Sequence, residues 1–216
     1  FEDNNNPDGY YSNYSNELHE MVSAKNWEEL RFHLVSAEDF MVSKLAGEVD
    51  GYGRTPLMLA CCQGQDFPPD VARLLIAVNS KSITKMVPPE GERQTSCLHV
   101  ALSARCSPVL IAILIKSYQK ATRTVDKAGN TPLHLAVNRL RGEYSSQVFK
   151  DDLSDTDTLS DSIYSTMNFF RNGDPSHIAV CKMLIEANPD ALRHRNNTGA
   201  TPLLLAIYSR APSDLI

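Results

Sequence analysis

Apolar residues in this chain are grouped into short segments with helical spacing, separated by polar and turn-forming residues. Within each segment they recur every three or four positions, as on one face of an α-helix. The first segment is broken near Lys25-Asn26, which predicts two short helices there. These segments span residues 17–35, 70–78, 97–105, 108–118 and 175–187. The pattern predicts an all-α fold built from short, paired helices.

A turn-and-helix motif leads into several of these helices. Residues 126–136 read Asp-Lys-Ala-Gly-Asn-Thr-Pro-Leu-His-Leu-Ala, and similar segments occupy residues 50–60 and 196–206. In each copy a glycine stands two residues before Thr-Pro, where a tight turn needs the positive φ that glycine adopts without strain. Threonine as N-cap with proline at the first helical position is a strong helix start. Each copy therefore predicts a turn that runs directly into a helix, with Leu133, Leu135 and Ala136 facing the core.

The motif resembles the ankyrin repeat, and a looser copy ends in Ser-Cys-Leu-His-Val-Ala at Ala101. The resemblance implies a solenoid of about five stacked helix-turn-helix units with short β-turn or hairpin connections. On this basis an N-terminal arm, residues 1–16, precedes a repeat domain, residues 17–216. The expected repeats are 17–49, which lacks Thr-Pro, 50–90, 91–125, 126–195 and a partial repeat 196–216. Residues 81–93 carry extra length, and residues 40–45 are expected to add a helical turn.

The fourth repeat contains an insertion, residues 142–173, between its two helices. From Glu143 to Asp174 there are seven acidic and two basic residues, a net charge of −5 that equals the formal charge of the chain. This composition favours disorder. A solvated variable loop is one interpretation, and a regulatory or docking loop that covers a row formed by Arg54, Arg93 and Arg139 is the other. Candidate phosphorylation sites are Ser154, Thr156, Thr158, Ser160 and Ser162.

Composition places the chain among intracellular proteins. The longest apolar run, residues 109–115, is too short to span a bilayer, and the N-terminus lacks the features of a signal peptide. Five cysteines without CxxC spacing indicate a reducing compartment. We expect a cytoplasmic location, with the nucleus or an organelle as alternatives. The first residue is Phe1, which leads us to expect a preceding segment.

Histidines in the motif are the first candidates for chemistry. His99 and His134 occupy the histidine of the repeat motif, and the resemblance implies that they tie the turn to its helix. His177 and Cys181 are four residues apart on an expected helix, but two ligands do not complete a zinc site. We therefore expect these four side chains to be structural.

Thiol and phosphate chemistry find little support. Cys61, Cys62 and Cys97 lack the neighbouring base and orienting group that a nucleophile needs. No Gly-rich phosphate loop, HExxH or GxSxG motif occurs, and no Lys/Arg cluster suits a nucleic acid. These observations predict a protein that is not an enzyme and has no cofactor, metal, nucleic-acid or small-molecule partner.

The resemblance implies a protein-interaction scaffold or adaptor that binds a protein partner through turn tips and first helices, without inserting into a membrane. Tyr and Arg contribute most to interfaces, so Tyr52, Arg54, Arg93, Arg139 and Tyr208 are the strongest candidates. The alternatives are a regulatory or targeting module of a larger enzyme or channel, and a permanent subunit of a large assembly. The expected binding residues are Tyr52, Arg54, Gln63, Glu92, Arg93, Thr95, Ser103, Lys127, Asn130, Asn138, Arg139, Asn197 and Tyr208.

Overall fold

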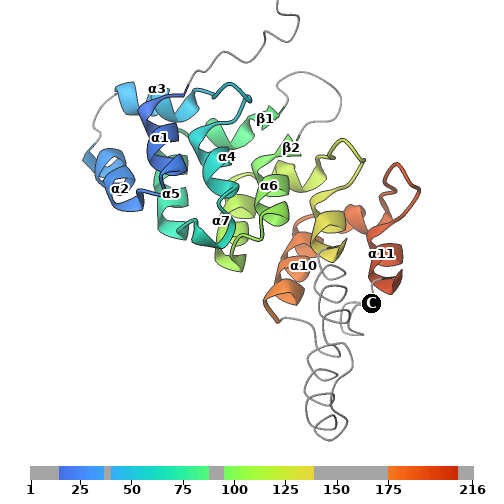
Figure 1. The fold of residues 1–216 in the computed structure, drawn as a ribbon. Coiled ribbons are helices and arrows are strands. Elements are labelled where there is room, and N and C mark those ends of the chain that lie inside the picture. The colour runs from blue at the N-terminus through green and yellow to red at the C-terminus, as the bar shows by residue number, and fades with distance from the viewer. Residues whose placement is uncertain (1–14, 37–39, 88–94, 139–174, 209–216) are drawn as a thin grey trace, which may run out of the picture. The chain divides into compact units, whose positions relative to one another are not determined.

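The computed structural model describes residues 15–36, 40–87, 95–138 and 175–208 (Figure 1). The chain divides into two compact units, Phe1–Tyr118 and Gln119–Ile216, here named unit 1 and unit 2. Most of the described residues are helical, and the described strands are only two residues long. The expected all-α fold is confirmed.

Unit 1 contains three stacked helix pairs. The first helix of each pair lies against the next, because α1 packs on α4 and α4 on α6, while the second helices stack as α2 on α5 and α5 on α7. The leucine two positions after each N-cap, Leu18, Leu57 or Leu98, is buried in the first layer. The pairs are α1 (Glu17–Ser23) with α2 (Trp27–Ser36), α4 (Pro56–Cys61) with α5 (Pro69–Val78), and α6 (Cys97–Ser103) with α7 (Pro108–Ser117).

Four short elements and a further helix complete the described part of unit 1. The helical turn expected at residues 40–45 is a full helix, α3 (Phe40–Gly47), which packs on α5. The expected extra length contains η2 (Ser82–Thr84) and strand β1 (Met86–Val87). β1 pairs antiparallel with β2 (Thr95–Ser96), Met86 opposite Ser96, and η1 (Gly64–Asp66) follows α4.

The structure corrects two predicted core faces. In α5 the sequence predicts a buried stripe of Arg73, Leu74, Leu75 and Ile76, but the buried residues are Val71, Ala72 and Leu75, whereas Arg73 is exposed and Leu74 and Ile76 are half-buried. Four consecutive residues would circle the helix, and only positions i, i+1 and i+4 share one face. For the same reason the helix at residues 132–138 buries Leu133, Ala136 and Val137 and leaves Leu135 half-buried.

Unit 2 repeats the turn-and-helix arrangement around its own core. The first helix is described over residues 132–138, and the remainder of its expected range lies outside the described residues. The inserted residues 142–173, with the five candidate phosphorylation sites, also lie outside them. The other elements are η3 (Gln119–Arg123), α10 (Pro175–Ala187), η4 (Pro189–Arg193) and α11 (Pro202–Tyr208). No helix within the described ranges is long and apolar enough to cross a membrane.

Candidate partner-binding surface

The turn at residues 50–54 is held by its first side chain. The Oδ1 atom of Asp50 accepts hydrogen bonds from the backbone N–H groups of Tyr52 and Arg54, each at 2.9 Å. The carbonyl of Asp50 accepts from the N–H of Gly53 at 2.8 Å. Gly53 has φ of 76°, the left-handed conformation that the Gly-x-Thr-Pro spacing predicts. The backbone of this tip is therefore fixed by local hydrogen bonds.

Two turns in unit 2 repeat this geometry. Oδ1 of Asp126 accepts from the N–H groups of Ala128 and Asn130 at 2.8 Å, and Oδ1 of Asn196 accepts from those of Thr198 and Ala200 at 3.1 and 3.0 Å. The glycines of these turns have φ of 76° and 80°. The third residue of the turn is Tyr52, Ala128 or Thr198. The three tips thus share one backbone conformation and present different side chains.

His134 ties the first helix of unit 2 to the following turn. Its Nε2 atom lies 3.1 Å from the carbonyl oxygen of Ala200, which can only accept, so Nε2 carries the proton. Nδ1 then accepts from the hydroxyl of Thr131 at 2.8 Å. Burial lowers the pKa of His134, and the Ala200 carbonyl opposes that shift. The ring is neutral at pH 7, and both of its nitrogens are engaged in structural hydrogen bonds.

This Thr-His pair lacks the geometry of a nucleophile and its base. Thr131 is buried, and its hydroxyl donates to a ring whose other nitrogen contacts a backbone carbonyl. A catalytic pair needs an accessible hydroxyl and a third group that stabilises the charged imidazole. A neutral carbonyl stabilises that charge poorly, so the Thr131–His134 contact is structural and not catalytic.

His19 links a first helix of unit 1 to the following turn in the same way, although it was not among the residues predicted from the sequence. Its Nε2 lies 2.9 Å from the carbonyl oxygen of Arg54, and its Nδ1 lies 2.9 Å from Oδ1 of Asn16. Asn16 is the N-cap of α1 and accepts from the N–H of His19 at 3.2 Å. The segment Asn16-Glu-Leu-His19 therefore occupies the place of Thr-Pro-Leu-His. A cap residue, then Leu and His two and three positions later, was the signal that could have identified it.

All the remaining candidate residues for chemistry except Cys62 are buried. The N-cap hydroxyl of Ser96 lies 2.8 Å from Nδ1 of His99, as the motif predicts. Desolvation raises the pKa of the Cys97 thiol to about 12 and that of Cys61 well above its usual value. Such thiols remain protonated at pH 7 and are poor nucleophiles. His177 and Cys181 are also buried, and no cluster of three metal-binding side chains occurs in the part of the chain that is described.

Arg54 has a partner within its own turn, which the motif does not predict. Its guanidinium forms an ion pair with Asp50 at 2.7 Å and lies 4.7 Å from the ring centroid of Tyr52. Burial works to raise the pKa of Asp50, but hydrogen bonds from Arg54 and from the turn N–H groups bring it below its usual value. Arg54 therefore brings an already paired guanidinium to the expected row, and the row itself stays a prediction. Its other two members, Arg93 and Arg139, lie outside the described residues.

The other expected binding residues fall into three groups. Ser103, Lys127, Asn138, Asn197 and Tyr208 are exposed, Gln63, Thr95 and Asn130 are half-buried, and Glu92 lies outside the described residues.

Two of the expected binding residues also join neighbouring turns of unit 2. Oδ1 of Asn130 accepts from Nδ2 of Asn196 at 2.9 Å, and Nδ2 of Asn197 donates to the carbonyl of Lys127 at 3.1 Å. Asn130 and Asn197 thus hold the tips together as well as lining them.

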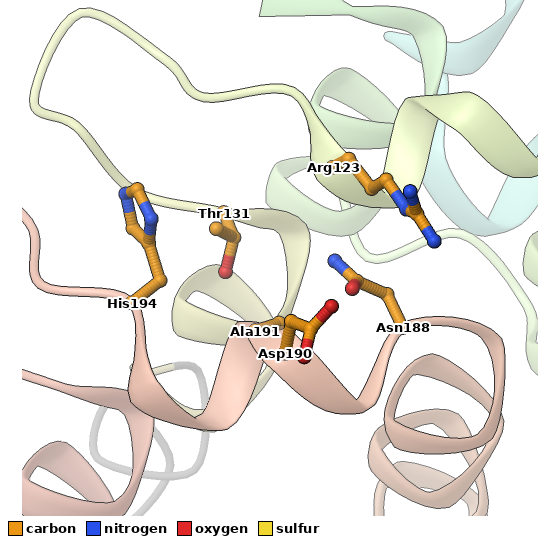
Figure 2. A pocket seen from close by; sticks show the side chains of 6 residues that line it. All are labelled: Arg123, Thr131, Asn188, Asp190, Ala191 and His194. Carbon is orange, nitrogen blue, oxygen red and sulfur yellow. The ribbon is translucent and has the colours of Figure 1, made fainter.

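A polar hollow of about 190 Å³ opens on unit 2 (Figure 2). Two of its polar side chains are already engaged, because Thr131 donates to His134 and Nδ2 of Asn188 donates to the carbonyl of Thr122 at 2.9 Å. The other polar groups, a cation, an anion and an imidazole, are exposed and define no single ligand class. The hollow is lined by Arg123, Thr131, Asn188, Asp190, Ala191 and His194.

Comparison with known proteins identifies one repeat. Residues 52–84, from the tip of the first turn to the end of η2, match the family model described as ankyrin repeat. No curated protein matches the chain. A similar solved structure is that of a predatory endopeptidase from Bdellovibrio bacteriovorus in complex with an immunity protein. The match has 17% identity, covers 91% of this chain and 93% of that chain, and has a TM-score of 0.41. This similarity is too distant to bear on fold or function.

Proposed function

We propose that this chain, which contains an ankyrin repeat over residues 52–84, is a non-catalytic scaffold that binds a protein partner through its turn tips and first helices. The observation that carries the proposal is the set of three turns with one backbone and different tip side chains. A fixed backbone lowers the entropy lost on binding, and variation at the tips supplies specificity.

The tip of unit 1 has the chemistry of an interface hot spot. Tyr52 is 66% exposed, and the Arg54 guanidinium stacked on its ring is held by Asp50. Tyrosine and arginine are enriched at hot spots because they combine a large contact area with hydrogen bonding. Since Arg54 is already paired, we expect Tyr52 to contribute more to binding than Arg54.

The tips of unit 2 are mainly polar. Lys127, Thr198 and Asn197 are exposed there, and Tyr208 extends from the end of α11. A mixture of amides, one cation and an aromatic ring suits a folded protein surface more than a highly charged polymer. The five cysteines are all free, which favours a reducing, cytoplasmic setting for the proposed scaffold.

The test is affinity capture from the source cells with the full chain, followed by mass spectrometry. Tyr52→Ser and Lys127→Glu are compared with wild type and with Val109→Ser, an exposed apolar residue of α7 that lies outside the tips. We expect a protein that wild type and Val109→Ser retain and the two tip variants lose, with all circular dichroism spectra unchanged. Capture that is insensitive to both tip variants, or a turnover that depends on His134 or Cys97, would contradict the proposal.

A further inference from the structure

We propose that unit 1 carries a second docking site, separate from the turn tips, that binds a basic amphipathic helix of a protein partner. The site is the apolar surface formed by Phe32, Val35, Phe40 and Met41, here named the outer patch. These side chains are 71%, 70%, 80% and 55% exposed. The site extends the proposed scaffold function to another face of the chain.

The exposure is unusual for a folded repeat domain. In stacked repeat proteins the outermost face meets water and is normally polar, since no neighbouring repeat covers it. Here the two phenylalanines are among the most exposed apolar side chains of the described residues. A cluster of large exposed apolar side chains on a folded domain is typical of an interaction site.

A partner helix of about three turns is long enough to reach both parts of the patch. Phe32 and Val35 are three positions apart on α2 and share one face. Five residue steps separate Val35 from Phe40, so the chain limits their distance to about 18 Å. That is the length of roughly three helical turns. Both α2 and α3 pack on α5, which holds the two parts of the patch on one support.

The negative charge around the outer patch favours a basic partner. Four glutamates of α1 and α2 are exposed: Glu17, Glu20, Glu28 and Glu29. Two nearby basic residues are already paired: Lys25, between the two helices, with Asp66 at 2.5 Å, and Arg31 of α2 with Asp70 and with Glu28, each at 2.6 Å. The first repeat therefore presents excess negative charge.

The acidic side chains lie on the same side of α2 as the patch. Phe32 follows Glu28 by four positions and Glu29 by three, so the three side chains leave the helix on the same side, and the Glu28 side chain is 89% exposed. An anionic lipid surface would be repelled. A partner helix with Lys or Arg beside its apolar stripe would be attracted, and its ridge of side chains suits the i, i+3 ridge of α2.

The test starts with a display library of random peptides of about 16 residues selected on the full chain. The double variant Phe32→Ser/Phe40→Ser serves for counter-selection. We expect the peptides that require the patch to have apolar residues at i, i+3 or i+4 and i+7, with Lys or Arg at one end. A selected peptide, measured by fluorescence anisotropy, should bind the double variant at least about 30-fold more weakly, and Val109→Ser as wild type does.

A charge swap tests the polarity of the site without removing apolar area. Glu29→Lys should weaken the binding of the basic peptide by about tenfold. A peptide with Glu in place of its Lys residues should recover most of that lost affinity when it binds the Glu29→Lys variant. Acidic selected peptides, or peptides insensitive to the double variant, would overturn the proposal.

Other occupants predict different outcomes. A dimer of wild type that dissociates in Phe32→Ser/Phe40→Ser would show that a second copy occupies the patch. Patch-dependent binding to vesicles of phosphatidylcholine and phosphatidylserine, or tighter peptide binding after deletion of residues 1–14, would assign it to lipid or to the N-terminal arm. Each of these results would overturn the proposal while leaving the role of the turn tips untouched.

Discussion

The start of α1 in unit 1 and the start of the helix at residues 132–138 in unit 2 perform one task with different residues. Asn16 caps the first and Thr131 the second, and the next residue is Glu17 in one and Pro132 in the other. In both, a buried leucine follows two positions after the cap, and a histidine three positions after it.

The histidines also share a target. His19 contacts the carbonyl of Arg54 at 2.9 Å, and His134 that of Ala200 at 3.1 Å. Each carbonyl belongs to the residue just before the threonine that starts the next first helix, Thr55 or Thr201. The comparison teaches that the histidine link between consecutive repeats is retained where the Thr-Pro pair is lost.

A substitution at the fifth position after the cap should give the largest difference in stability between the two regions. This position is a buried alanine in Ala136 and a half-buried methionine in Met21. Ala136→Asp places a charge where there is neither water nor a partner, and we expect it to reduce the free energy of unfolding by about 3–5 kcal/mol. Met21→Asp should cost less than about 2 kcal/mol, because its carboxylate can reach water. Chemical denaturation measures both, and equal losses would show that a side chain at position 21 has no better access to water than one at position 136.

Removing the histidine link tests whether the two regions depend on it equally. His19→Ala and His134→Ala each leave a buried carbonyl and a cap without their ring partner. We expect each to cost about 2 kcal/mol, within about 1 kcal/mol of the other. If His19→Ala cost far less than His134→Ala in chemical denaturation, the asparagine cap would be sufficient without the ring.

The sequence pattern predicted the helices well wherever local chemistry decides them. Thr-Pro placed the starts of α4 and α11, and α10 spans the predicted residues 175–187. These starts depend on a cap and a proline that act within one turn. The buried faces of short helices were predicted less well, because contacts with neighbouring helices decide them, as Leu135 and Arg73 show.

The binding surface was predictable only in part. The motif located the tips, so the exposure of Tyr52 and Lys127 followed from it. The pairing of Arg54 with Asp50 and the link from Asn130 to Asn196 depend on side-chain geometry that a motif does not specify. The outer patch was missed because Phe32 and Val35 have the spacing of a core stripe. Only the fold shows that they face outward.

The turn glycines provide a matched pair within unit 2. Gly129 and Gly199 have nearly the same φ, but a Cβ on Gly129 would lie 2.5 Å from Oδ1 and 3.0 Å from N of Asn197, whereas one on Gly199 meets nothing within 4 Å. Gly199→Ala should cost about 1 kcal/mol from the left-handed backbone alone. Gly129→Ala should cost about 1 kcal/mol more, because the turn at residues 196–200 must shift. Thermal unfolding of both variants checks this, and equal losses would place the two turns further apart than the hydrogen bonds of Asn197 indicate.

The smallest expected effect is the pH dependence of the histidine link. Burial lowers the pKa of both His19 and His134 below the usual 6.5, although the carbonyls of Arg54 and Ala200 oppose it. Below pH 6.5 the unfolded chain therefore binds protons that the folded chain does not, so stability is complete above pH 6.5 and declines as the pH falls. Asp50 has a lowered pKa and loses its contribution only below its usual 3.8, outside this window. We expect the denaturation midpoint to decrease as the pH is lowered from 7.5 to 5.5. The decrease should be smaller in His134→Ala and smallest in the double variant His19→Ala/His134→Ala. Val109→Ser should retain the wild-type slope. A midpoint that rose on acidification would mean that the rings are protonated in the fold, and the neutral link assigned to His134 would be wrong.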